Sequence, residues 1–152
     1  MIIISAMSEN RVIGSGDGMP WSVPKEYEQY LRFVSGNVVV LGRKSYEIFG
    51  PDLPTGTKAI VLTRSTSVDG AEAAPSLADA LEMANGMGPT VFVAGGGSVY
   101  EQAIPLADEM YLTTIKGEFD GDTYFPAFNV EEWEIVEERD EVDFVFRRYR
   151  RK

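Results

Sequence analysis

Glu26 is the carboxylate whose position best fits acid–base chemistry, in a chain that contains neither histidine nor cysteine. Without histidine there is no imidazole base, and without cysteine there is no thiolate nucleophile or thiolate metal ligand. Serine-triad hydrolases and zinc hydrolases are therefore excluded as classes. Acid–base chemistry must depend on carboxylates, Tyr, Lys or water, so a single well-placed Asp or Glu becomes the residue to find.

The local pattern places Glu26 in the first turn of a predicted helix over Pro24–Val34, which opens with proline in that turn. A carboxylate at this position also stabilises a helix N-terminus, which is the purely structural interpretation. At a spacing of four residues, Glu26 and Tyr30 share one face beside the apolar stripe of the helix. We therefore expect Glu26 at the inner edge of the stripe and Glu28 in solvent.

The segment before this helix, residues 10–24, is a long connection with three glycines and two prolines. A loop of this length without regular structure in a compact domain is usually functional, often as a lid over a site. We expect it to close over the site that holds Glu26.

Three consecutive glycines, Gly95, Gly96 and Gly97, follow a predicted buried strand and precede a predicted helix. Glycines let the backbone approach a phosphate closely, and a helix N-terminus offers free amides and a partial positive charge. The pattern is not the GxGxxG fingerprint, and three glycines also form tight turns. On this loop alone, a diphosphate site and a simple turn both stay open.

Cations end two other predicted strands, although the chain as a whole is acidic. Arg43 and Lys44 precede Ser45 at one strand end, and Arg64 follows Thr63 at another. Randomly distributed basic residues would rarely lie at the ends of two consecutive strands in so acidic a chain. We therefore expect these groups to bind one shared anion. A diphosphate loop with a separate cationic cluster is what a nicotinamide dinucleotide with an extra ribose phosphate requires, which favours NADPH over NADH.

The charge balance argues against nucleic acid as a partner. The chain has 24 acidic and 14 basic residues, a net charge of −10, whereas phosphate neutralisation needs excess Lys and Arg. Five of the basic residues lie in the last six positions and continue an alternating apolar run, so we predict an edge strand with solvated charges rather than a nucleic-acid arm. No apolar stretch approaches 20 residues and no signal peptide is apparent, so we expect a cytoplasmic protein without membrane contact.

Apolar runs and helical patterns alternate along the chain, which predicts an α/β fold with a mainly parallel sheet in a single domain, 1–152. The last two runs, Trp133–Glu137 and Val142–Arg148, predict a terminal antiparallel hairpin. The remaining strands are predicted at Ile2–Ala6, Val38–Leu41, Ala59–Leu62, Val91–Ala94 and Met110–Ile115. The remaining helices are predicted at Ser76–Ala84 and Val99–Ala107.

Together these segments resemble the dihydrofolate reductase family along nearly the whole chain. The matching motifs, in the family's order and spacing, include NRVIG from Asn10, MPWSVP from Met19, LGRKSYE from Leu41, IVLTR from Ile60, AGGGSVY from Ala94, YLT from Tyr111 and DGDTYFP from Asp120. The resemblance implies an eight-stranded, mostly parallel sheet with an antiparallel C-terminal strand and about four helices. It also implies NADPH-dependent reduction of a dihydropterin, with dihydrofolate as the expected substrate, in a protein we expect to be a monomer.

The resemblance also implies roles for individual residues. Glu26 matches the buried acid that orients the pterin while water delivers a proton to the ring. Thr113 matches a hydroxyl that supports this carboxylate, Trp21 a lid residue that orders a water, and Tyr111 a neighbour of the reacting ring. The other expected substrate contacts are Ile4 and Ala94 by their carbonyls, Ser5, Tyr27, Tyr30, Phe49 and Leu53.

For the cofactor, the resemblance implies contacts from five segments and a cis peptide at Gly96–Gly97. The expected residues are Ala6, Ile13, Gly14, Gly18 and Met19; Gly42, Arg43, Lys44 and Ser45; Leu62, Thr63 and Arg64; Ala94, Gly95, Gly96, Gly97, Ser98, Val99 and Tyr100; and Thr123. The segment from Asp120 to Thr123 is acidic but lacks the later carboxylates of a calcium loop. We expect no metal there, and a loop packed near the lid instead.

One departure from the family's pattern concerns the substrate tail. Thr57 stands where the family has an Arg that pairs with the α-carboxylate of the folate glutamate. Either Lys58 or Arg32 replaces that Arg, or the natural substrate is another dihydropterin, such as a methanopterin type.

Two further hypotheses stay open from the sequence. One is the related pyrimidine reductase of riboflavin synthesis, which shares the sheet and the glycine loop but is not expected to keep the lid and the acid. The second is a non-catalytic NADPH-binding module that has kept the fold, against which the intact lid, Glu26 and Thr113 argue.

Overall fold

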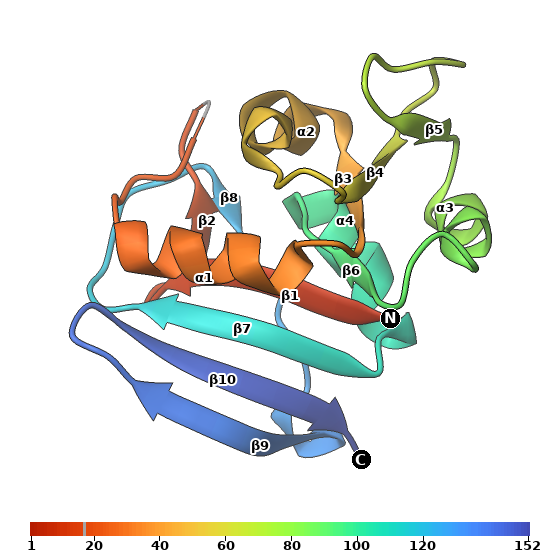
Figure 1. The fold of residues 1–152 in the computed structure, drawn as a ribbon. Coiled ribbons are helices and arrows are strands. Elements are labelled where there is room, and N and C mark those ends of the chain that lie inside the picture. Colours follow the sequence, from red (N-terminus) through yellow and green to blue (C-terminus); the bar gives the residue numbers. More distant parts are fainter. Residues whose placement is uncertain (17) are drawn as a thin grey trace.

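An eight-stranded sheet organises the computed structural model, which describes residues 1–16 and 18–152 (Figure 1). The strand order is β5-β4-β3-β6-β1-β7-β10-β9, and all neighbours pair in parallel except β7 with β10 and β10 with β9. The predicted fold is thus confirmed. The strands are β1 (Ile2–Ser8), β3 (Val38–Gly42), β4 (Lys58–Leu62), β5 (Glu72–Ala74), β6 (Val91–Val93), β7 (Glu109–Ile115), β9 (Trp133–Asp140) and β10 (Phe144–Arg151).

In the described part of the chain, four α-helices cover the sheet: α1 (Pro24–Val34), α2 (Arg43–Phe49), α3 (Leu77–Ala84) and α4 (Gly97–Ala103). As predicted, α1 begins at Pro24, and the Ser76 hydroxyl caps α3 by accepting from the Asp79 amide at 3.1 Å. The predicted helix Val99–Ala107 is shorter than expected and continues as a 3-10 turn, because Pro105 cannot extend an α-helical ladder. The 3-10 turns are η1 (Gly50–Asp52), η2 (Ile104–Leu106) and η3 (Val130–Glu132).

The alternation of strand side chains explains why both faces are covered. In β3, Val38 and Val40 pack in the cluster with α3 and α4, whereas Val39 and Leu41 pack in the cluster with Val34 of α1. Figure 1 shows α1 lying across one face of β1 and β7, with α4 on the other face. A strand buried on both faces must be apolar throughout, which is why β3 is a continuous apolar run.

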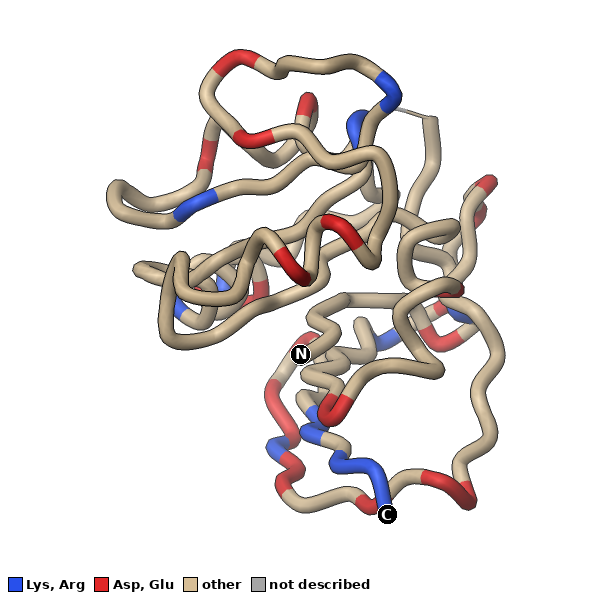
Figure 2. The backbone as a smooth tube through the Cα atoms, turned by 90° about the vertical axis from the view of Figure 1, so that its right-hand side faces the viewer, with Lys and Arg blue, Asp and Glu red and all other residues tan. Residues whose placement is uncertain are grey.

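The C-terminal segment corrects one prediction. The last strand, β10, is not an edge strand, because it pairs with β7 on one side and β9 on the other. Its arginines are matched by acidic neighbours: Arg147 pairs with Glu138 at 2.9 Å, and Arg148 pairs with Glu109 at 2.8 Å. In Figure 2, basic residues near the C-terminus lie beside acidic ones. The sequence pattern located the hairpin, but its order in the sheet depends on long-range pairing.

A second, two-stranded sheet joins β2 (Val12–Gly14) to β8 (Thr123–Tyr124). These strands, like β5, are two or three residues long, and no alternation over so short a run could predict them. Gly121 is required here, because a Cβ atom at this position would lie 2.5 Å from the Gly14 carbonyl oxygen. No helix in the described part of the chain is long and apolar enough to span a membrane.

Candidate functional site

Two contiguous cavities lie where the carboxyl ends of the parallel strands meet, which is where ligands bind in open α/β sheets. The first is narrow and mainly apolar and lies between α1, β1, β7 and the glycine loop. The second is larger, about 500 Å³, and lies between the glycine loop, α2 and the end of β4. Ile13, Ser45, Phe49 and Gly96 line both cavities, so a ligand in one can contact a ligand in the other.

Glu26 is the acidic residue that lines the first cavity. Its side chain is buried, with 6% of the residue exposed, and no group in residues 1–16 or 18–152 hydrogen-bonds to the carboxyl. Burial removes water from the charged form and raises the pKa of Glu26 to about 7. The carboxyl can therefore exist in either protonation state near neutral pH, and its oxygens remain available to a ligand.

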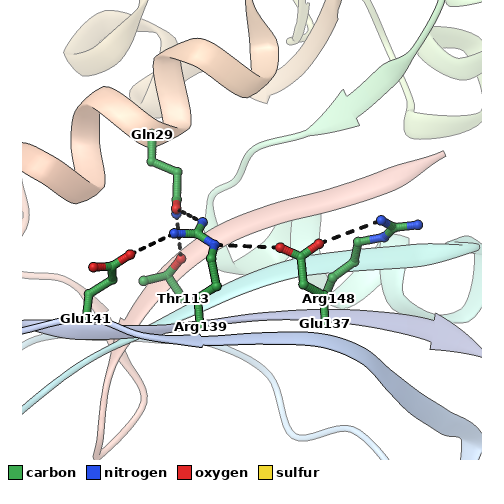
Figure 3. Close-up of polar contacts among 6 residues, drawn as sticks. All are labelled: Gln29, Thr113, Glu137, Arg139, Glu141 and Arg148. Atoms are coloured by element: carbon green, nitrogen blue, oxygen red, sulfur yellow. Dashed lines mark hydrogen bonds and ion pairs between the residues drawn. The ribbon is translucent and has the colours of Figure 1, made fainter.

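Thr113 and Gln29 line the same cavity as Glu26, and Figure 3 shows their side chains pointing toward each other. Thr113, on β7, was predicted, whereas Gln29 was not. Gln29 is 4% exposed, and its Nε2 donates to the Thr113 hydroxyl at 3.4 Å. A signal was present in the sequence, because a residue three positions after Glu26 shares its helix face. A glutamine among charged neighbours, however, has the local pattern of an exposed residue.

Aromatic rings form the wall of the cavity near α1. The Tyr27 and Tyr30 rings stack with their centroids 5.9 Å apart, and the Tyr27 ring lies 6.3 Å from that of Phe49. The Tyr27 hydroxyl donates to Asp52 Oδ2 at 2.6 Å, which ties α1 to η1. These rings present flat apolar surfaces on which a planar heterocycle can pack.

Most predicted substrate residues line this first cavity, and two do not. Those that line it are Ile4, Ser5, Glu26, Tyr27, Tyr30, Phe49, Ala94, Tyr111 and Thr113. Leu53 instead packs against the apolar cluster that contains Val39 and Leu41. Trp21 is buried against Phe119, with their ring centroids 5.6 Å apart. The Trp21 indole Nε1 is a buried donor without a partner in the described structure, which fits a residue that holds water.

The glycine loop forms the junction of the two cavities. Gly96 is the N-cap of α4, and Gly95 accepts a hydrogen bond from the Gly42 amide at 2.7 Å. Space is limited here, because a Cβ atom at Gly97 would lie 3.0 Å from Thr123 Cγ2. The predicted cis peptide at Gly96–Gly97 is wrong, since the cis bond is Gly95–Gly96. Gly97 already belongs to α4, so the chain turns one residue earlier.

Three cations line the second cavity: Arg43, Lys44 and Arg64. Arg43 also pairs with Glu47 at 3.3 Å and donates to the Ser65 hydroxyl at 3.4 Å, which holds its guanidinium at the strand ends. This donor set, beside the amides of a helix N-terminus, fits a phosphate-bearing dinucleotide.

All the predicted cofactor residues lie on one of the two cavities. The second is lined by Ile13, Gly14, Gly18, Gly42, Arg43, Lys44, Ser45, Leu62, Thr63, Arg64, Gly96, Gly97, Ser98, Val99 and Thr123. The first is lined by Ala6, Met19, Ala94, Gly95 and Tyr100. Sequence reasoning missed a group from the β5–α3 junction, namely Pro75, Ser76 and Leu77, because no phosphate motif marks that segment.

The segment predicted as a lid packs against the loop that contains Asp122. The Gly16 amide donates to Asp122 Oδ2 at 3.0 Å, and the Asp122 amide donates to the Gly14 carbonyl at 3.0 Å. The expected proximity of these two loops is therefore observed. Asp17, which belongs to the predicted lid, lies outside the described residues. Within residues 1–16 and 18–152, no group of acidic residues is arranged to hold a metal ion.

Known proteins match both the sequence and the fold. A family model described as "Dihydrofolate reductase" matches residues 1–151. The chain is 33% identical to the dihydrofolate reductase of Bacillus subtilis, with 98% of this chain and 93% of that protein covered. It is 36% identical to dihydrofolate reductase HdrB of Haloferax volcanii, with 99% and 83% covered. A solved structure of the Enterococcus faecalis dihydrofolate reductase, complexed with NADP(H) and RAB-propyl, superposes with a TM-score of 0.89 at 29% identity, covering 99% of this chain and 95% of that one.

The burial of Glu26 predicts a pH-dependent cost to stability. The pKa of the Glu26 carboxyl rises from 4.5 in the unfolded chain to about 7 in the fold. Protonation of this carboxyl therefore stabilises the native state. The contribution is fully present below pH 4.5 and is lost as the pH rises through 7. Glu26→Gln replaces the carboxyl by an amide that is neutral at every pH. Above pH 7 the variant should therefore have a free energy of unfolding about 1–3 kcal/mol higher than the unaltered protein. The two proteins should be equally stable below pH 4.5, as measured by urea denaturation. If the two proteins differed equally in free energy of unfolding below pH 4.5 and above pH 7, the buried charge would not be the cause.

Proposed function

The chain belongs to the dihydrofolate reductase family and reduces dihydrofolate to tetrahydrofolate with NADPH, and from this premise we propose how its own residues carry the reaction. The central role falls to Glu26. The observation that supports it is a buried, unpaired carboxyl in an apolar cavity, directly beside the cavity that carries the phosphate-binding features.

Glu26 binds and orients the pterin. The ring presents an amino group and an adjacent ring N–H, and an ionised carboxylate accepts from both in a bidentate pair. The negative charge stabilises positive charge that develops on the ring when its imine nitrogen takes a proton from water. NADPH, when bound, supplies the hydride to the carbon of that imine. The reaction consumes a proton, so the rate falls as the pH rises.

Neighbouring groups complete the substrate site. We propose that the Thr113 hydroxyl donates to the carboxylate once substrate is bound. The unpaired indole N–H of Trp21 holds the water that delivers the proton. The carbonyls of Ile4 and Ala94 face the edge of the ring, beside Ser5 and Tyr111. Tyr100 supports this edge, because its hydroxyl donates to the Ile4 carbonyl at 2.8 Å. The rings of Tyr27, Tyr30 and Phe49 form the apolar wall of the cavity, and Leu53 belongs to the apolar cluster that includes Ile4.

The second cavity holds the cofactor. Gly96, Gly97 and the first amides of α4 bind the diphosphate, while Arg43, Lys44 and Arg64 bind the ribose phosphate that distinguishes NADPH from NADH. Ala6, Ile13 and Gly14 flank the nicotinamide, at the point where the two cavities join. We place this activity in the cytoplasm, in a monomeric single domain spanning 1–152. The net charge of −10 and the absence of cysteine support this placement.

Replacing Glu26 by Gln should abolish most turnover without affecting the cofactor. The amide cannot supply a negative charge or accept both ring donors, so kcat/KM for dihydrofolate at neutral pH should fall by about 100-fold or more. NADPH binding, followed by fluorescence titration, should be unchanged because Glu26 does not line the second cavity. A variant with normal turnover would remove Glu26 from this role.

Arg43→Ala should weaken NADPH binding by about tenfold, because a charge-assisted bond to the ribose phosphate is lost. The dissociation constant of NADH should not change, since NADH lacks that phosphate. Glu47→Gln is the matched control: it breaks the same surface ion pair but keeps the guanidinium. An unchanged preference for NADPH in Arg43→Ala would assign the phosphate to Lys44 or Arg64.

The first cavity offers little positive charge to the glutamate tail of the substrate. No Lys or Arg is among the described residues that line the first cavity, and Asp52 is bonded to its wall through Tyr27. The Thr57 hydroxyl accepts from the Gly36 amide at 3.1 Å. Lys58 Nζ donates to the Met87 carbonyl at 2.9 Å, away from this cavity, while Arg32 is exposed on α1. Of the two candidates for the missing Arg, Arg32 therefore remains the better placed.

We therefore expect dihydrofolate and dihydropteroate, which lacks the glutamate, to differ by less than about tenfold in kcat/KM, the value of one charge-assisted bond. Asp52→Asn should shift the ratio toward dihydrofolate by removing a repulsive charge. Arg32→Met is the companion variant. A preference for dihydrofolate well above tenfold that Arg32→Met abolishes would show that Arg32 binds the tail carboxylate.

A further inference from the structure

Gln29 connects the catalytic cavity to the C-terminal hairpin. It is buried on α1, and its amide lies between the Thr113 hydroxyl of β7 and the guanidinium of Arg139 on β9 (Figure 3). The carboxamide oxygen accepts from Arg139, and the carboxamide nitrogen donates to Thr113. Both polar ends of the side chain are therefore used, although Gln29 and Arg139 are 110 residues apart in the sequence.

The strand register explains how Arg139 reaches α1 from the sheet edge. Phe146 of β10 is the cross-strand partner of Thr113 on one side and of Arg139 on the other. The three side chains therefore form a row across β7, β10 and β9 on the face covered by α1. The Arg139 guanidinium lies 4.9 Å from the centroid of the Phe146 ring. This cation–π contact holds the Arg139 side chain across Phe146, so that it extends toward Gln29.

The orientation of the Gln29 amide is determined by Arg139. A guanidinium has donors and no acceptor, so the group that faces it must be an oxygen. The nitrogen of Gln29 then faces Thr113 and donates to its hydroxyl oxygen. A hydroxyl that accepts from one side directs its single proton elsewhere, and both Thr113 and Glu26 line the same cavity. Glutamine suits this position because its side chain carries an acceptor and a donor together.

We propose that Gln29 is a positioning residue, which holds the Thr113 hydroxyl so that its proton is donated to the Glu26 carboxylate, with Arg139 fixing the orientation of the Gln29 amide. This inference rests on the role assigned to Glu26 above. The proposal adds a series of hydrogen bonds that runs from Arg139 on the edge strand β9 through Gln29 to Thr113.

The effect comes from hydrogen-bond orientation, because carboxylates counter the charge of Arg139. Arg139 pairs with Glu141 at 2.9 Å and with Glu137 at 3.6 Å, and Glu137 also lies 3.9 Å from Arg148. Arg148 pairs with Glu109 and lies over the Tyr111 ring. With two arginines and three glutamates, the network presents no net positive charge to the cavity, and breaking it changes where the Thr113 proton points.

Among the described residues, the other titratable groups that line the cavity with Glu26 are tyrosines from three elements: Tyr27 and Tyr30 on α1, Tyr100 on α4 and Tyr111 on β7. Burial is the largest cause that raises the pKa of each of these hydroxyls. They stay neutral across the range in which Glu26 titrates, so a change in the pH profile near neutrality can be assigned to Glu26.

The test is the pH dependence of the chemical step, measured as NADPH oxidation in a single turnover with the cofactor already bound. Gln29→Met keeps the length and burial of the side chain and removes both hydrogen bonds. Loss of the oriented Thr113 donor destabilises the ionised carboxylate, so the midpoint of the profile should move up by about 0.5 pH unit. In a Thr113→Val background, Gln29→Met should cause no further shift, because it acts through that hydroxyl.

Arg139→Met is the second variant, which frees the Gln29 amide without altering the helix, and it should shift the midpoint in the same direction. Arg147→Met is the matched control, since it removes another Arg–Glu pair of the same hairpin that does not contact α1. It should leave the profile unchanged. An unshifted midpoint in both folded variants, or an equal shift in the Thr113→Val background, would overturn the proposal. If Glu26→Gln still loses turnover, the assigned function stands independently.

Discussion

The burial of one carboxyl group is the constraint around which this site is built. Holding Glu26 in an apolar cavity with its pKa raised to about 7 costs about 3 kcal/mol of stability when the group is ionised. Burial of an ionised acid in the first turn of a helix costs stability, because water no longer solvates the charge. Here Pro24 begins the helix just before Glu26, the lid segment precedes it, and the sheet beneath supplies apolar strands that exclude water. The same exclusion makes the charge effective, because electrostatic interactions strengthen when water is removed.

The parallel sheet brings the partners of Glu26 together. The carboxyl ends of β1, β3, β4 and β6 meet at one edge, so a glycine loop, a cationic strand end and the carbonyl of Ile4 lie around one pair of cavities although the sequence separates them. The distribution of charge follows the same geometry. In a chain of net charge −10, Arg43, Lys44 and Arg64 gather at the cavity that suits a phosphate-bearing ligand, while the neighbouring cavity holds an acid and aromatic rings.

The sequence predicts the parts of this arrangement that depend on local pattern. Glu26 on its helix face, the glycine loop and the cations at strand ends all follow from spacing within about ten residues. The placement of β10 inside the sheet could not be predicted, because an alternating, arginine-rich terminal strand has the local pattern of an edge. The cis bond lies at Gly95–Gly96, one residue before its expected position, and α4 begins at Gly97, two residues before the expected Val99. Gln29 was missed because its partners, Thr113 and Arg139, are brought to it only by tertiary structure.

The hairpin formed by β9 and β10 has a role in this site that its sequence does not suggest. An exposed edge strand rich in Glu and Arg is commonly explained as protection against edge-to-edge association, and β9 fits that description along most of its length. Arg139 departs from it, since its side chain crosses Phe146 and ends at a buried amide on α1. Glu137 and Glu141 hold the guanidinium on its remaining sides, so its charge is balanced while its donors keep a fixed direction. The charged edge thereby also fixes the hydrogen bond to the Gln29 amide beside the cavity that Glu26 lines. Under the proposed mechanism, a substitution of Arg139, which does not line that cavity, reaches Glu26 through Gln29 and Thr113.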